Sequence, residues 1–180
     1  SIISDIAQVL HVNPEEARLL YLRYGKAMGS LAKAEDMFEV RSDPDYSSDP
    51  IKKVSKATLA AIIEARLEEV FMLIKQQLIN KELYPRLGTG IMFTGGGALL
   101  PGISQLAHGV FDFPAKISRG SFVQGLPDNL KSPLYSCALG LLCYHLQSKI
   151  DGVSLSYALL SPRKAPVFKR IISSVQKIFI

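Results

Sequence analysis

The stretch GIMFTGGGA, residues 90–98, places a short apolar run directly before three consecutive glycines. A run of this length fits a buried strand, and glycine allows the backbone to turn where the strand ends. Helical patterns follow at 104–111 and 132–147, and a second short strand pattern lies at 114–118. The order strand, glycine turn, helix, strand, helix predicts part of an α/β unit.

The three glycines, Gly95, Gly96 and Gly97, allow two interpretations. Backbone N–H groups without side chains over them can approach a phosphate or a nucleotide, but a tight structural turn needs glycine for the same reason. Neither common nucleotide motif is complete: Ala98 stands where a P-loop has Lys, and Leu100 where the Rossmann fingerprint has its third glycine. The local pattern alone leaves the structural turn as the default.

The residues before this stretch are mostly helical in pattern. Helices are predicted at 4–12 and, with Asn13 as the N-cap and Pro14 in the first position, at 14–24. A strand at 37–40, a polar loop at 41–53 and a long helix at 55–81 follow. A mostly helical lobe therefore precedes the α/β part.

One arginine interrupts an apolar column of the long predicted helix. At helical spacing, the side that carries Arg66 is otherwise apolar: Leu59, Ile62, Val70 and Leu73. The simplest explanation is a side chain at the edge of the core that extends to solvent or pairs with Glu69 or another acid.

Positive charge is concentrated at the C-terminal end. The chain has 21 Lys and Arg against 16 Asp and Glu, and from residue 152 onward it has five cations and no acid. The remaining residues are therefore close to neutral. Such asymmetry predicts an anionic partner for the C-terminal segment, either a lipid surface or nucleic acid.

The last residues have the pattern of an amphipathic helix. A linker is predicted at 151–166, and a helix at 167–180 would be apolar on one face and basic on the other. A terminal helix packed on the core would show the same stripe, but the linker and the absence of acids favour a membrane surface over a core, and no nucleic acid is expected. The predicted membrane-binding residues are Phe168, Lys169, Arg170, Ile171, Ile172, Val175, Lys177, Ile178 and Phe179.

Other motifs argue against several classes of protein. There is no GxSxG, HExxH or CxxC, so we expect no catalytic residue and no metal ligand. Cys137 and Cys143 are interpreted as reduced core residues. No apolar run approaches the ~18 residues of a membrane span, and the first residues lack a signal peptide, which predicts a cytoplasmic protein. Because the chain does not begin with Met, we expect it to be part of a longer protein.

Taken together, several stretches resemble the C-terminal half of FtsA, the actin-like bacterial cell-division family. The resemblance covers nearly the whole chain and depends on the order of its parts more than on any one of them. Those parts are Arg23-Tyr24-Gly25 with Ala27 and Gly29-Ser30, Ile63-Glu64-Ala65-Arg66, the stretch 90–98, Pro133-Leu134-Tyr135-Ser136 with Ala138 and Gly140-Leu141-Leu142, and the amphipathic tail.

This resemblance implies an actin/Hsp70-like fold of the α/β class, present in part. Residues 1–87 would form the helical, partner-binding subdomain, and 88–150 an incomplete nucleotide-binding subdomain. Gly95, Gly96 and Gly97 would border ATP, with Mg²⁺ held by residues of the missing half. Arg66 would help to hold the C-terminal peptide of the tubulin-like protein FtsZ.

The family also implies a role and a place in the cell. The protein would polymerise, contact other divisome proteins and tether FtsZ filaments to the inner face of the cytoplasmic membrane, an early step of septum assembly. It would be an ATP-binding scaffold with a weak ATPase activity at most. The alternatives are an FtsA-related pilus-assembly adaptor, which should lack the terminal helix, and part of an actin-superfamily kinase or phosphatase.

One departure from the family lies in the second helix. Arg18 and Tyr21 stand where relatives are expected to have Glu and Lys on the face that meets the adenosine. The resemblance therefore leaves open whether this chain binds the nucleotide as tightly as its relatives.

Overall fold

The computed structural model describes residues 1–42, 51–119 and 125–149, with the backbone alone for 146–149. It has two compact units. The first comprises residues 1–93 and 100–116, and the second comprises residues 94–99 together with the described residues after 116. These bounds differ from the subdomain boundary expected after residue 87, which remains a prediction.

Two short helices begin the first unit. Helix α1 (Ile2–Leu10) ends at His11, which adopts a left-handed conformation, so the helix stops before the predicted Val12. Helix α2 (Pro14–Tyr24) has the predicted bounds because the Asn13 side chain accepts a hydrogen bond from the Glu16 N–H and Pro14 fills the first turn. A 3₁₀ turn, η1 (Gly29–Leu31), follows.

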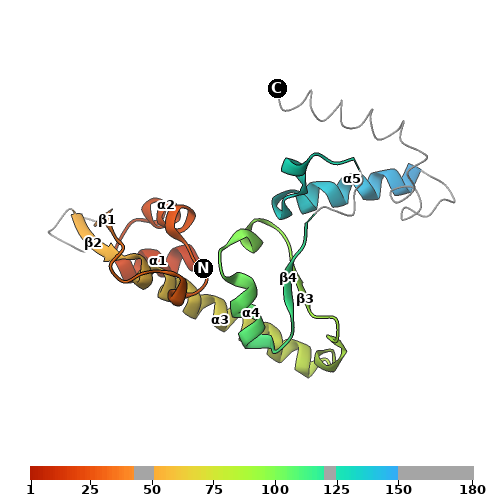
Figure 1. The fold of residues 1–180 in the computed structure, drawn as a ribbon, viewed down its shortest axis with the longest axis horizontal. Helices are drawn as coiled ribbons and strands as arrows, with labels where there is room; N and C mark the ends of the chain where they lie inside the picture. The colour runs from red at the N-terminus through yellow and green to blue at the C-terminus, as the bar shows by residue number, and fades with distance from the viewer. Residues whose placement is uncertain (43–50, 120–124, 150–180) are drawn as a thin grey trace. The chain divides into compact units, whose positions relative to one another are not determined.

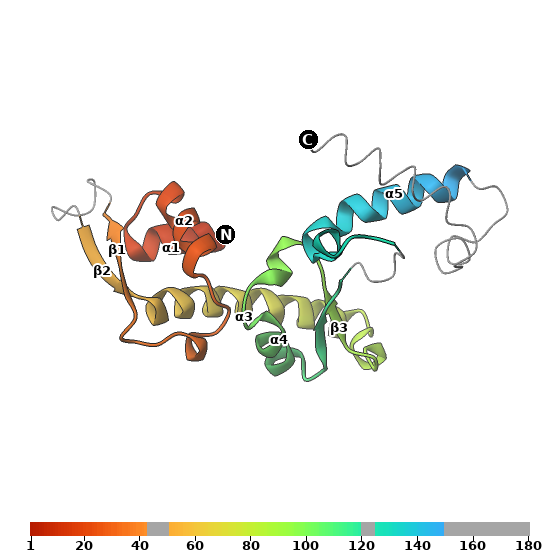
Figure 2. The same cartoon turned by 45° about the horizontal axis from the view of Figure 1, so that its top comes forward.

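Helix α3 (Lys56–Asn80) is the axis of this unit, and Ser55 caps its N-terminus. Its buried residues Leu59, Ile63, Leu67 and Phe71 recur every four residues and form one stripe. In Figures 1 and 2, α1 and α2 lie along the first half of α3, and α4 (Ile103–Phe111) lies beside its second half. One continuous core therefore joins the helical lobe to α4.

Two small sheets flank this core. The antiparallel pair β1 (Met37–Arg41) and β2 (Ile51–Ser55) lies at the start of α3, with Phe38 opposite Val54. Strand β2 corrects the polar loop predicted at 41–53. Two consecutive lysines, Lys52 and Lys53, interrupt the alternation of apolar and polar residues that is typical of a strand. Pairing with β1 stabilises β2 despite this weak pattern. The second pair is β3 (Ile91–Phe93) and β4 (Ala115–Ile117).

Aromatic rings bind β3 to the core of the first unit. The Phe71 ring of α3 lies 5.5 Å from that of Phe93 and 5.7 Å from that of Phe111. The turn η2 (Tyr84–Arg86) joins α3 to β3, and the Tyr84 hydroxyl donates a 2.7 Å hydrogen bond to the Phe111 carbonyl. The start of the glycine-containing stretch is thereby fixed by residues from three elements.

The second unit contains short 3₁₀ turns and one helix. The turns are η3 (Gly96–Leu99), η5 (Asp128–Lys131) and η6 (Pro133–Tyr135), and α5 (Ser136–Lys149) follows them directly. Leu126 and Leu139 are buried against each other, with Cys143 partly buried beside them. Cys137 is exposed, which corrects its interpretation as a core residue: it lies on a face of α5 turned away from this small core.

Candidate functional site

The glycine turn is held to the beginning of α5. The Gly95 N–H donates a 3.1 Å hydrogen bond to the Pro133 carbonyl, and the Thr94 hydroxyl donates a 2.6 Å bond to that of Ser136. Gly95 has φ of 82°, a left-handed conformation that glycine adopts without strain. This position thus requires glycine for its backbone conformation.

The next two glycines leave the backbone uncovered. Gly96 and Gly97 are exposed. A Cβ added at Gly97 would have no atom within 4 Å, whereas one at Gly96 would lie 3.2 Å from the Leu134 Cδ1 atom. At Gly97 the structure therefore imposes no packing reason for glycine, and the open backbone surface fits the close approach of a ligand.

Arg18 and Tyr21 lie on α2 of the first unit. Arg18 is exposed. Tyr21 is half-buried, and burial raises the pKa of its phenol above the ordinary value. The glycine turn belongs to the second unit, so the structure describes these two parts of the expected nucleotide site separately.

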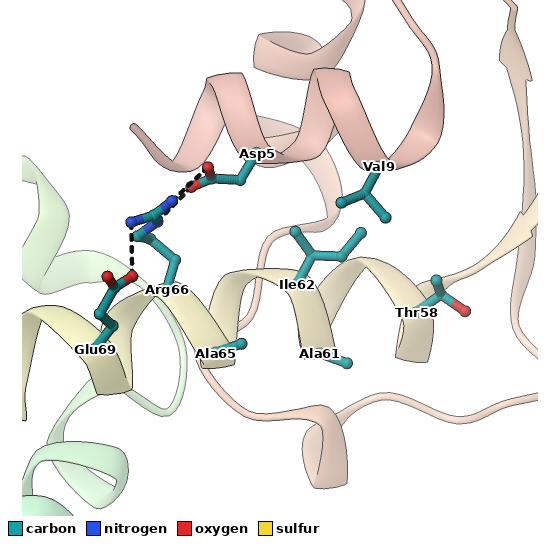
Figure 3. A pocket seen from close by; sticks show the side chains of 8 residues that line it. All are labelled: Asp5, Val9, Thr58, Ala61, Ile62, Ala65, Arg66 and Glu69. Atoms are coloured by element: carbon teal, nitrogen blue, oxygen red, sulfur yellow. Dashed lines mark hydrogen bonds and ion pairs between the residues drawn. The ribbon is translucent and has the colours of Figure 1, made fainter.

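A groove of about 520 Å³ runs between α1 and α3 in the first unit. Figure 3 shows Val9 of α1 facing Ile62 of α3, with Ala61 and Ala65 on the same stretch of α3. The charged end of the groove is formed by three side chains, Asp5, Arg66 and Glu69. The groove thus combines an apolar surface with a cation, and of the predicted apolar column only Ile62 lines it beside Arg66.

Arg66 makes three hydrogen bonds to two carboxylates. Its Nε and Nη2 atoms each donate a 2.6 Å bond to an oxygen of Asp5, and its Nη1 atom donates a 2.6 Å bond to Glu69. The guanidinium lowers the pKa of Asp5, first through the hydrogen bonds and also through its charge, and Asp5 in turn raises the pKa of Arg66. Each group of the Asp5–Arg66 pair therefore favours the charged form of the other.

Sequence reasoning identified Arg66 and its partner Glu69 but not Asp5. Glu69 is one helical turn along α3, a spacing that a sequence pattern reveals. Asp5 is 61 residues away, and only the packing of α1 on α3 brings it to the guanidinium. In the sequence, the position of Asp5 in the first turn of a predicted helix was the only indication that it could pair with a distant cation.

The predicted linker at 151–166 and amphipathic helix at 167–180 lie outside the described residues. Their membrane-binding role therefore remains a prediction. Among the helices of the described ranges, none is long and apolar enough to cross a membrane.

Comparison with known sequences gives one consistent family. The model of the family described as cell division protein FtsA matches residues 1–140. The cell division protein FtsA of Pseudomonas aeruginosa is 33% identical over 180 residues, which cover 97% of this chain and 42% of that protein. The FtsA of Borreliella burgdorferi is 36% identical over 148 residues, which cover 82% of this chain and 35% of that protein. The FtsA of Escherichia coli K12 is 30% identical over 181 residues, which cover 97% of this chain and 40% of that protein.

Solved structures show the same fold at lower identity. The crystal structure of MreB5 of Spiroplasma citri bound to ADP superposes with a TM-score of 0.61 at 19% identity, covering 82% of this chain and 44% of that one. The AMPPNP-bound structure of the same protein gives a TM-score of 0.62, also at 19% identity, covering 82% and 43%. The chain thus spans less than half the length of each of these relatives and structures.

Proposed function

Because the chain belongs to the FtsA family of cell-division proteins and has part of the actin-like fold, we propose that it is an ATP-binding, polymerising scaffold that tethers FtsZ filaments to the membrane. It would act at the inner face of the cytoplasmic membrane, early in septum assembly, together with other divisome proteins. Its ATPase activity would be weak at most. Anionic lipids would bind the basic tail.

The observation that carries the proposal is the placement of Arg66 at the charged end of an apolar groove. A peptide with an acid and apolar side chains, as expected of the FtsZ tail, would form a charge-assisted hydrogen bond with Arg66 in place of the exposed Glu69 and cover the apolar surface beside it. The apolar contacts would supply most of the binding energy, and the guanidinium would select the acidic peptide.

Nucleotide binding is supported by the open glycine turn. The two similar solved structures, both of MreB5, are bound to ADP and to AMPPNP. In this chain Gly95, Gly96 and Gly97 would border ATP, and Mg²⁺ would accompany it. Arg18 and Tyr21 would set how tightly the adenosine is held.

Changing Gly97 to Asp is expected to weaken ATP binding by more than about tenfold, because it places a negative charge beside the phosphates. The new Cβ meets nothing within 4 Å, so the fold should persist. Isothermal calorimetry on the full-length protein that contains this chain measures the effect. The control is Gly109→Asp, since Gly109 is exposed on α4 and its added Cβ is equally unobstructed. Unchanged affinity in Gly97→Asp would remove the turn from the nucleotide site.

The scaffold role is tested by reconstitution. FtsZ polymers, anionic vesicles and the full chain with ATP are mixed and then centrifuged at low speed, so that only vesicles and what they carry are collected. FtsZ should be recovered with the vesicles when the chain is present and left behind when it is absent. The proposal would be contradicted if FtsZ were recovered with the vesicles in the absence of the chain, or equally well when neutral vesicles replace the anionic ones.

A further inference from the structure

The two carboxylates that bind Arg66 are held very differently. Asp5 uses both oxygens on two guanidinium nitrogens, and its side chain is 19% exposed. Glu69 makes a single bond to Nη1 and its side chain is 56% exposed. The first contact joins α1 to α3, whereas the second lies within α3 at a spacing of three residues.

This difference determines which carboxylate can be displaced. A bidentate arginine–carboxylate pair fixes the plane of the guanidinium and is the stronger arrangement. An exposed pair three residues apart on one helix contributes little, because water solvates Glu69 well when the contact opens. Of the two acids, Glu69 is the one that an incoming ligand can replace at Nη1.

The charges around Arg66 favour this replacement when the ligand is acidic. One positive and two negative groups meet at this end of the groove, so its net formal charge is negative while both pairs are closed. A carboxylate that approached the closed arrangement would be repelled by both Asp5 and Glu69, and Glu69 would already use one of the two Nη1 N–H groups. Once Glu69 turns into solvent, the same donor is available.

We propose that Glu69 occupies the position beside Arg66 that a ligand's carboxylate would take and, by competing with it, sets how tightly acidic peptides bind. The inference rests on the proposed docking of the FtsZ tail at Arg66. Asp5 remains in place and orients the guanidinium, while the apolar part of the peptide covers Val9 and Ile62. Glu69 is therefore a specificity-determining residue that discriminates against acidic ligands.

The test measures the binding of two synthetic peptides to the full chain by fluorescence anisotropy. One is the C-terminal peptide of FtsZ from the same genome, and the other has every side-chain carboxylate replaced by the amide. Glu69→Gln is expected to tighten binding of the acidic peptide about threefold to tenfold and to leave the amide peptide within about twofold. Glu68→Gln, which removes the same charge one position away on α3, should change neither by more than about twofold.

Each other result has a definite meaning. If Arg66→Gln weakens the acidic peptide but Glu69→Gln does not tighten it, the competition is absent and the docking site stands. If Glu68→Gln and Glu69→Gln tighten it equally, general charge is responsible and the proposed placement of Glu69 is wrong. If the acidic peptide does not bind, or binds Arg66→Gln as well as the parent chain, the groove is not its site, and the proposed docking and the competition both fail.

Discussion

Changing Arg66 to Glu is expected to weaken binding of the FtsZ tail peptide by well over about tenfold, because attraction to the peptide's acid becomes repulsion. In this variant Asp5 and Glu69 would surround a third carboxylate, and the link between α1 and α3 would be lost. We therefore expect a lower melting temperature as well.

Exchanging the charges of Asp5 and Arg66 separates the loss of peptide affinity from the loss of thermal stability. In the double variant Asp5→Arg with Arg66→Asp, the pair between α1 and α3 can form again with its ends reversed. Calorimetric melting should show stability recovering relative to Arg66→Glu, whereas anisotropy should show that peptide affinity does not recover, because the cation no longer projects from α3. Recovery of both would mean that Arg66 acts only through the packing of α1, and the peptide docks elsewhere.

Changing both Phe168 and Ile172 to Glu is expected to abolish co-sedimentation with anionic vesicles. Full burial of each apolar side chain contributes about 1.5–3 kcal/mol, and lipid attraction adds up to about 1 kcal/mol for each cation. Ordering the segment offsets much of this, so a single tail binds weakly and several tails on one polymer bind together. Two buried charges would remove the remaining affinity.

The matched control places the same two charges on the opposite side of the predicted helix. In Ser173→Glu with Gln176→Glu, the apolar face is intact, so sedimentation should be reduced by the added negative charge but still measurable. Equal loss in both double variants would show that charge alone holds the chain to vesicles. Undiminished sedimentation of the first variant would reject this segment as the anchor.

The sequence by itself determined the elements whose signals are local. Asn13 and Pro14 fixed the start of α2, and the stripe from Leu59 to Phe71 fixed α3, because caps and helical periodicity act within a few residues. The same local order around Gly95 and the resemblance that it carried led to the family, which the comparisons confirm. The prediction of an arginine in an apolar column also needed only the spacing of α3.

The tertiary structure determined the contacts between segments that are distant in the sequence. Strand β2 has a weak pattern of its own and exists through its pairing with β1. The glycine turn is anchored by Pro133 and Ser136, some forty residues away along the chain, and Arg66 is oriented by Asp5, 61 residues before it. A sequence shows that Arg66 needs a counter-charge, but only the packing of α1 on α3 selects Asp5 to supply it. Because Asp5 holds one edge of the guanidinium in a bidentate pair, Glu69 is the more exposed of the two acids and the one that a ligand can replace.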